Sequence, residues 1–378
     1  MNDAPGLNIV QACGSRSWGG LEMQALQTAS GLRERGHHLW MLCPQGSTLE
    51  KESRSQGFKT LPILDAYQTA GKSFRKIAGF FRSENIDVVH THLSHDLIVL
   101  TPALRISRSF AGFFLTKHMA SGIKKRTPVH RWLYSRLDRI FSISNYIRGS
   151  VINTCPVSAG KVSVLFNGID LSQYDTEKWK HTTLRNQLKI GEYEIVIGII
   201  GRISRGKGHI ELFQAARLLR KRMSRPLKFI VVGGPSRNEE SLYQEIRARA
   251  KELLSTADII FAGQQNNIPE YMAIFDILAF PSHEESFGVV LIEAMAMGLP
   301  LVACDSGGVP DIVLPDKTGL LVPPRDHVAL ADALEKLISN PGLALAMGSA
   351  GRKRVEEHFS FNAYIDALLE HYNSHKSA

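Results

Sequence analysis

The stretch EIVIGIIGRISRGKGHIELF, residues 194–213, indicates the fold class most clearly. Its first eight residues, 194–201, form an almost unbroken run of apolar side chains rich in Ile, which predicts a buried β-strand. Residues 201–208 then bring three glycines and three cations, and a segment of helical period follows them. A strand that passes through such a turn into a helix is the repeating unit of a parallel α/β sheet.

The same alternation runs along the chain on both sides of this stretch. Near-continuous hydrophobic strands joined by helices are typical of parallel sheets that are covered on both faces. Twelve such strands fit two open, doubly wound sheets better than one eight-stranded barrel. The predicted strands are 7–13, 39–43, 88–92, 112–117, 139–144 and 162–166 in the first half, and 194–201, 228–233, 258–262, 277–280, 301–304 and 319–322 in the second.

The sequence predicts two domains and a separate last helix. A length of 378 residues suits two domains better than one. The turn dipeptide Asn167-Gly168, followed by the strandless polar segment 172–183, marks the linker. We therefore predict Rossmann-like α/β domains over 1–167 and 168–358. Residues 359–378 carry apolar side chains at helical spacing, and we expect them to form a helix that packs back on the first domain.

The composition is that of an ordinary globular protein, with 44% hydrophobic and 21% charged residues, and it excludes disorder, collagen and coiled coil. No run of 18 apolar residues exists, and the first seven residues lack a basic region. We therefore expect neither a membrane-spanning helix nor a signal peptide, and a cytoplasmic location.

The positive charge lies in one part of the chain. Residues 1–170 hold 21 Lys and Arg against 11 Asp and Glu, and the stretch 72–148 alone holds 14 against 4. A basic surface indicates an anionic partner. Because the cations are scattered between buried strands, we expect no nucleic acid. The cluster Lys124-Lys125-Arg126 with Trp132 instead predicts docking on an anionic membrane surface, the inner face of the cytoplasmic membrane.

Ligands of open α/β sheets bind beyond the carboxyl ends of the strands, so residues that follow strands are the first candidates. Arg202 and Lys207, among glycines before a helix, suit a polyphosphate. The loop is not a Walker A motif, because Gly208 stands where Ser or Thr is needed. Gly19 and Gly20 follow the first strand, where glycines allow close approach of a ligand or simply make a tight turn.

Carboxylates and histidines follow other strands. Glu285 in a loop and Glu293 in the next helix can accept hydrogen bonds from sugar hydroxyls, and Glu293 needs a partner in its apolar setting. His118 at a strand end is either a ligand contact or a satisfied loop residue. His90, His92 and His95 lie at the end of another strand and just after it, but without an H-E-x-x-H pattern they predict no metal site.

These motifs together resemble the GT-B glycosyltransferases of family GT4. The residues that carry the resemblance are Gly19-Gly20 with Glu22, Val88 to His92, His118, Asn167 to Asp170, Gly201-Arg202 with Lys207-Gly208, Glu285-x-Phe287-Gly288, and Glu293-Ala294-Met295-Ala296-x-Gly298-x-Pro300. They are continued by Gly307 to Pro310 and Gly319 to Val322, and the match spans about residues 8–325. The resemblance implies two Rossmann-like domains that face a central cleft.

The resemblance also implies a retaining, metal-independent hexosyltransferase that needs no cofactor. Arg202 and Lys207 would hold the diphosphate of a nucleotide-sugar donor and stabilise the leaving group. Glu293 would accept from the ribose hydroxyls and Glu285 would face the transferred hexose, beside Phe287 and Gly288. His118 would bond the donor sugar. Gly19 and Gly20 would lie against the diphosphate or the acceptor.

On this resemblance we expect a UDP-hexose donor and a bacterial envelope acceptor, either a glycan or a lipid-linked saccharide such as lipopolysaccharide core or an O-antigen precursor. Two alternatives stay open. One is a GT-B-fold sugar-nucleotide epimerase, which would turn over its nucleotide sugar without an acceptor. The other is a glycosyltransferase with a small soluble acceptor.

Overall fold

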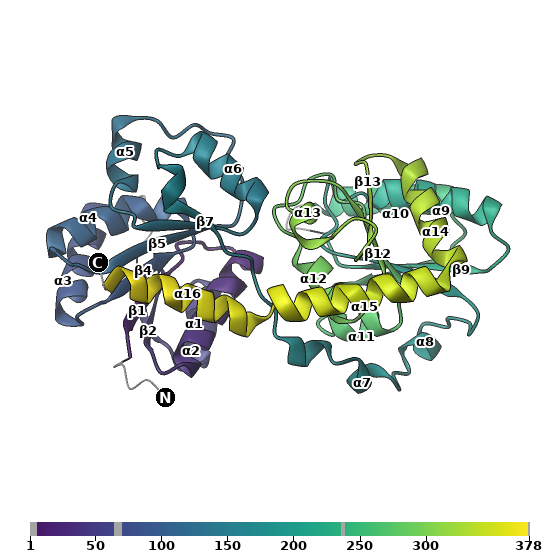
Figure 1. The fold of residues 1–378 in the computed structure, drawn as a ribbon, viewed down its shortest axis with the longest axis horizontal. Coiled ribbons are helices and arrows are strands. Elements are labelled where there is room, and N and C mark those ends of the chain that lie inside the picture. The colour runs from purple at the N-terminus through teal and green to yellow at the C-terminus, as the bar shows by residue number, and fades with distance from the viewer. Residues whose placement is uncertain (1–5, 64–69, 236–238, 377–378) are drawn as a thin grey trace. The chain divides into compact units, whose positions relative to one another are not determined.

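The chain folds into two compact units in the computed structural model, which describes residues 6–63, 70–235 and 239–376. One unit holds Met1–Phe166 and Phe361–Ala378, and the other holds Asn167–Ser360 (Figure 1). The predicted boundaries, after residues 167 and 358, lie one and two residues away. The fold class that we predicted, two Rossmann-like doubly wound parallel sheets, is confirmed.

The first unit is built on a seven-stranded parallel sheet of order β3-β2-β1-β4-β5-β6-β7. Its elements are β1 (Asn8–Ala12), α1 (Gly20–Glu34), β2 (His38–Pro44), α2 (Thr48–Ser55), β3 (Lys59–Ile63), α3 (Ala70–Ser83), β4 (Val88–Thr91), a 3-10 turn (Ser94–Asp96), α4 (Leu97–Ser107), β5 (Gly112–Lys117), α5 (Pro128–Tyr134), β6 (Arg139–Ser142), α6 (Asn145–Thr154), a 3-10 turn (Ala159–Lys161), β7 (Val162–Val164) and α16 (Phe361–Lys376).

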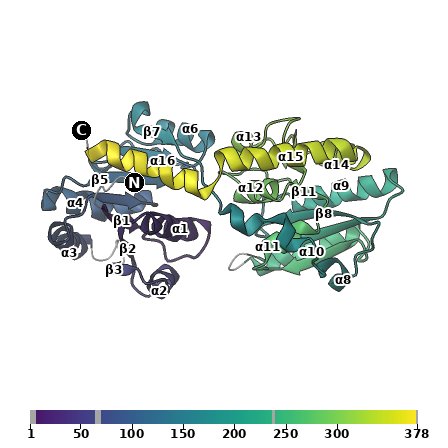
Figure 2. The same ribbon diagram turned by 60° about the horizontal axis from the view of Figure 1, so that its bottom comes forward.

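The second unit is built on a six-stranded parallel sheet of order β10-β9-β8-β11-β12-β13. Its elements are a 3-10 turn (Leu171–Tyr174), α7 (Thr176–Trp179), α8 (Leu184–Gln187), β8 (Ile195–Ile200), α9 (His209–Arg222), β9 (Leu227–Val232), α10 (Glu240–Leu253), β10 (Ile259–Gly263), α11 (Ile268–Ala273), β11 (Ile277–Phe280), α12 (Val289–Ala296), β12 (Leu301–Cys304), α13 (Val309–Ile312), β13 (Leu320–Val322), α14 (His327–Ser339) and α15 (Pro341–His358). Figure 2 shows α9 and α14 packed side by side.

The prediction of twelve strands was wrong by one, because it missed β3. This strand reads KTLPI and pairs with β2 alone, at the edge of its sheet. An edge strand needs neither a continuous apolar run nor a hydrogen-bond donor at every residue, so it tolerates Pro62. Its weak apolar pattern is the reason that the sequence did not reveal it.

Helix α16 completes the core of the first unit although it follows the second unit in sequence. Its Tyr364, Ile365, Leu368 and Tyr372 are buried in the same cluster as β1 and β2. A side chain at Gly31 of α1 would collide with Phe361 and Ile365, so the two helices pack closely. This contact explains why the apolar spacing of the last helix can be read from the sequence.

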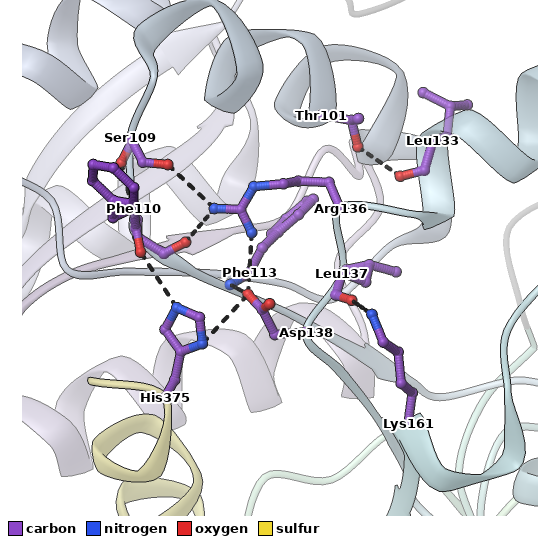
Figure 3. Close-up of polar contacts among 11 residues, drawn as sticks. Thr101, Ser109, Phe110, Phe113, Leu133, Arg136, Leu137, Asp138, Lys161 and His375 are labelled. Carbon is purple, nitrogen blue, oxygen red and sulfur yellow. Dashed lines mark hydrogen bonds and ion pairs between the residues drawn. The ribbon is translucent and has the colours of Figure 1, made fainter. Parts of the chain in front are cut away.

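Polar contacts fix the far end of α16 (Figure 3). His375 contacts the carbonyl oxygen of Phe110 through Nε2, 3.3 Å away, and its Nδ1 lies 3.8 Å from Asp138 Oδ2. The same carboxylate oxygen accepts from the backbone N–H of Phe113 at 2.7 Å and pairs with Arg136 at 3.1 Å. The helix is therefore tied to the amino end of β5 as well as to the apolar core.

Candidate functional site

Each sheet has one point at which the strand order reverses, between β1 and β4 in the first unit and between β8 and β11 in the second. Successive crossovers leave such a point in opposite directions, and ligands of doubly wound sheets bind at the strand ends there. The residues predicted to bind a ligand follow β1 and β5 in one unit and β8 and β11 in the other. The topology thus places the predicted residues of each unit at the carboxyl ends of the strands of its sheet.

The loop between β8 and α9 is held in a shape that only glycine allows at one position. Gly208 precedes α9 with φ of +74°, and a Cβ there would lie 2.0 Å from the carbonyl oxygen of Pro281. The loop therefore packs directly on the residues that follow β11. Arg202 at its start is exposed, whereas Lys207 near its end is half-buried.

Lys207 and Glu285 form an ion pair that sequence reasoning did not foresee. The Lys207 ammonium donates to Glu285 Oε2 at 2.6 Å, and both side chains are largely screened from solvent, with 27% and 18% of their surface exposed. Glu285 is also fixed through its backbone, since its carbonyl oxygen accepts from the N–H of Gly308 at 2.8 Å. The predicted cation and the predicted carboxylate are therefore direct neighbours, and both are preorganised.

Glu293 has a partner within its own unit. Its Oε1 accepts a hydrogen bond of 2.8 Å from the hydroxyl of Tyr174, a buried residue of the segment that follows the linker. Burial raises the pKa of the Glu293 carboxyl, and the Tyr174 hydrogen bond opposes that rise. One carboxylate oxygen, Oε1, is thus hydrogen-bonded within the protein. The sequence suggested that Glu293 needs a partner but gave no sign of Tyr174.

Phe287 and Gly288 lead into α12, the helix that carries Glu293. The Phe287 ring is buried and packs against Phe359, with ring centroids 6.1 Å apart. Its side chain therefore belongs to the core, and a contact of Phe287 with a donor would have to use its backbone. Gly288 lies at φ of +98° and begins the helix without a side-chain cap.

In the first unit, the smallness of Gly19 and Gly20 is not required by packing. A Cβ at Gly20 would meet no atom within 4 Å, and one at Gly19 would meet only Glu22 Oε2, at 3.6 Å. Neither residue has positive φ in the described backbone. Two adjacent glycines that the fold itself does not need, at the start of α1, leave backbone N–H groups open to close approach.

His118 is buried at the end of β5 and belongs to a histidine network. Its Nε2 lies 3.1 Å from Nδ1 of His92, and the two rings stack with centroids 5.3 Å apart. Burial lowers the pKa of His90 and of His118 to about 3, and that of His92 well below its usual range, so the three rings are neutral at physiological pH. Over the described residues, no group of His, Cys, Asp and Glu side chains is arranged to hold a metal ion.

Comparison with known proteins identifies the family. The model of glycosyl transferases group 1 matches residues 180–354, and the model of glycosyltransferase family 4 matches residues 18–173. The chain belongs to the GT4 family of GT-B glycosyltransferases and is a hexosyltransferase. These matches favour a transferase over the epimerase that the sequence left open.

A relative and two solved structures illustrate the likeness. The chain is 25% identical over 354 residues to a GDP-mannose-dependent α-(1-6)-phosphatidylinositol monomannoside mannosyltransferase of Mycobacterium tuberculosis, covering 89% of each chain. A glycosyltransferase structure from Rickettsia africae superposes with a TM-score of 0.88 at 22% identity, over 98% of this chain and 99% of that one. Anabaena HepE in complex with UDP superposes with a TM-score of 0.83 at 21% identity, over 97% and 100%.

The buried histidines make the stability depend on pH. A histidine whose folded pKa is lowered stays neutral in the fold, while the unfolded chain takes up the proton as the pH falls below about 6.5. The contribution of His90 and His118 to the free energy of unfolding is therefore lost as the pH falls from about 6.5 toward 3. From about pH 7.5 to about pH 5.5, the His118 ring should account for about 1.4 kcal/mol of the loss in unfolding free energy.

Urea denaturation at both pH values checks this. The loss in unfolding free energy between the two pH values should be smaller by about 1.4 kcal/mol for His118→Gln than for the wild type. The control His38→Gln, which changes an exposed histidine of the same unit, should match the wild type. An equal loss in all three proteins would contradict the lowered pKa of His118.

Proposed function

We propose that the protein transfers a hexose, with retention of configuration and without a divalent metal, from a UDP-sugar to a bacterial envelope acceptor. That acceptor is a glycan or a lipid-linked saccharide such as lipopolysaccharide core or an O-antigen precursor. The observation that carries the proposal is the half-buried Lys207–Glu285 pair. It lies at the point where the strand order of the second sheet reverses, between β8 and β11. A fixed cation beside a fixed carboxylate suits a departing diphosphate next to a sugar that gains positive charge.

Each predicted residue has a role in this reaction. Arg202 and Lys207 bind the diphosphate, and Lys207 is already oriented by Glu285. The carboxylate of Glu285 faces the anomeric side of the hexose. Glu293 accepts from the ribose through the oxygen that Tyr174 does not use. A cation fixed before the reaction, as Lys207 is, stabilises the leaving group with little reorganisation, so the proposed reaction needs no metal ion or other cofactor.

The remaining assignments concern the hexose, the acceptor and the nucleotide. His118 bonds a hydroxyl of the sugar, and the open backbone at Gly19 and Gly20 lies against the diphosphate or the acceptor. The backbone at Phe287 and Gly288 lies beside the donor. The HepE complex with UDP supports a UDP-sugar, whereas the mannosyltransferase relative is GDP-mannose-dependent. The uracil and guanine nucleotides are therefore the two donors to compare first.

Alanine substitution tests whether Arg202 and Lys207, here called the diphosphate clamp, bind the diphosphate. Arg202→Ala or Lys207→Ala should lower turnover by about 10² to 10³, the typical effect of removing one preorganised stabilising group. Arg205→Ala is the matched control: this cation of the same loop is 82% exposed and lies 3.6 Å from Glu245, so turnover should stay close to the wild type. Turnover is measured as nucleoside diphosphate release at saturating donor. Wild-type turnover in either clamp variant would remove that residue from the clamp.

A second test separates the two partners of Glu293. Glu293→Gln keeps the size and the acceptor for Tyr174, and should weaken nucleoside diphosphate binding by about 1 to 3 kcal/mol through loss of the charged acceptor. Tyr174→Phe keeps the carboxylate and should weaken binding less. Isothermal calorimetry measures both affinities. Equal losses would mean that Glu293 acts only as the partner of Tyr174, and an unchanged affinity in Glu293→Gln would end the ribose assignment.

An anionic membrane surface remains our proposed partner of the first unit, at the inner face of the cytoplasmic membrane. The loop after β5 and helix α5 expose Ile123, Val129 and Trp132, with 74%, 64% and 45% of their surfaces open, next to the cations Lys124, Arg126 and Arg131. Exposed apolar side chains among cations suit an anionic lipid surface. Each cation near such a surface contributes about 1 kcal/mol to the free energy of binding. Among the described helices, none combines the length and hydropathy needed to span a bilayer.

One cation of the predicted cluster, Lys125, has a partner within the first unit. The Lys125 ammonium donates to the hydroxyl of Tyr134 at 3.2 Å and lies 5.8 Å from the centre of that ring. Tyr134 and Leu133 are buried, so they hold α5 on the domain, and Trp132 alone of these three side chains is exposed. Lys124, Arg126 and Arg131 are the exposed cations of this segment, so they are the ones to test.

Sedimentation with vesicles of anionic lipid tests the docking. The protein should be captured at low salt and released at high salt, because ions screen surface attraction with a Debye length of about 8 Å at physiological ionic strength. Changing Lys124, Arg126 and Arg131 together to Glu should abolish capture. The same change at the exposed Lys221, Arg225 and Lys317 of the second unit alters the net charge equally and should leave capture intact. Equal recovery with neutral and anionic vesicles would count against docking and favour a small soluble acceptor.

A further inference from the structure

A hydrogen-bonded chain in the first unit links the C-terminal helix α16 to His118. The hydroxyl of Tyr372 lies 2.6 Å from Nδ1 of His90 and 3.3 Å from the side-chain nitrogen of Gln11. The side-chain oxygen of Gln11 lies 2.9 Å from Nε2 of His92, which in turn contacts His118 through Nδ1. All five side chains are buried, and the chain crosses β1, β4, β5 and α16.

The amide of Gln11 sets the direction of every bond in this chain. Its oxygen can only accept, so His92 carries its proton on Nε2 and presents a lone pair on Nδ1. His118 must then donate from Nε2 to that lone pair. Because a neutral imidazole has one proton, Nδ1 of His118 is left as a hydrogen-bond acceptor.

Tyr372 is the hydrogen-bond partner of the amide nitrogen of Gln11. Its oxygen accepts from the Gln11 nitrogen, and its own proton goes to Nδ1 of His90. His90 therefore donates from Nε2 to Thr116 Oγ1, 2.8 Å away. If Gln11 turned its amide over, each donor and acceptor between it and His118 would exchange, and the outer nitrogen of His118 would carry a proton.

Nδ1 of His118 makes no hydrogen bond to any residue that the structure describes, so it is the ring nitrogen left for a ligand. His118 follows β5 at the carboxyl end of the strand. β5 lies next to β4, where the strand order of the first sheet reverses. A lone pair there accepts from a hydroxyl and repels another acceptor.

We propose that Gln11 and Tyr372 are positioning residues that hold His118 with its proton on Nε2, so that Nδ1 accepts a hydrogen bond from a hydroxyl of the sugar ligand. The sugar contact rests on the proposed function, whereas the tautomer does not. The C-terminal helix thereby controls the hydrogen-bonding character of a residue that it does not touch.

Histidine nitrogen NMR tests the tautomer directly. In protein labelled with ¹⁵N-histidine, the His118 signals, assigned by their loss in His118→Gln, should show a protonated Nε2 and an unprotonated Nδ1. In Tyr372→Phe and in Gln11→Met, which break the chain at different points, this pattern should give way to a mixture or to the opposite tautomer. The matched control is Tyr364→Phe, which removes another buried hydroxyl of α16, one that contacts Thr28 at 3.1 Å outside this chain. It should keep the wild-type pattern.

Kinetics test the consequence for the sugar. Tyr372→Phe and His118→Gln should each lower kcat/KM for the nucleotide sugar by about threefold to tenfold, the effect of one hydrogen bond, and the double variant should be no worse than His118→Gln. Tyr364→Phe should leave kcat/KM unchanged. Affinity for the nucleoside diphosphate alone should stay the same in all of them, because it lacks the sugar.

The outcomes separate the two halves of the proposal. A wild-type His118 protonated on Nδ1, or a Tyr372→Phe variant whose His118 tautomer matches that of Tyr364→Phe, would overturn the control of the tautomer. The expected tautomer together with an unchanged kcat/KM in His118→Gln would overturn the sugar contact, and with it the role given to His118 in the proposed function. Additive losses in the double variant would show that Tyr372 acts by another route.

Discussion

The strand order of each sheet reverses at one point, and this reversal places the candidate ligand-binding loops. At such a point the chain leaves two neighbouring strands toward opposite faces, so no crossover helix covers the strand ends. Backbone N–H groups and side chains of the following loops are then free to meet a ligand. The Gly201 to Gly208 loop, the Glu285 loop and the turn at Gly19 and Gly20 all follow from this one feature.

Charged groups placed at these strand ends need partners while no ligand is bound. Lys207 pairs with Glu285, and Glu293 accepts from Tyr174, so neither carboxylate bears the full cost of desolvation. His90, His92 and His118 of the first unit meet the same requirement in another way: burial keeps them neutral, and one hydrogen-bonded chain connects them. These contacts both stabilise the units and preorganise their candidate functional groups.

Local patterns predicted most of the fold and the identity of the candidate residues, but not their partners. Buried parallel strands such as β8 are continuous apolar runs that can be recognised singly, whereas the edge strand β3, with Pro62, cannot. Glycines and cations after a strand point to a ligand loop without further knowledge. Tyr174 and Glu293 are 119 residues apart, and Gln11 and Tyr372 are 361 apart, so no local signal connects them. Such pairs are set by tertiary packing alone.

We expect Arg202 and Lys207 of the second unit to bind the diphosphate of a nucleotide sugar without a divalent metal. Calorimetric titration of the protein with UDP, GDP and ADP, in buffer containing a metal chelator and again with magnesium, measures this binding. One of the three nucleotides should bind with clearly higher affinity than the other two, and its affinity should be the same in both buffers. Binding of that nucleotide only in the presence of magnesium, or no binding of any of the three, would contradict this expectation.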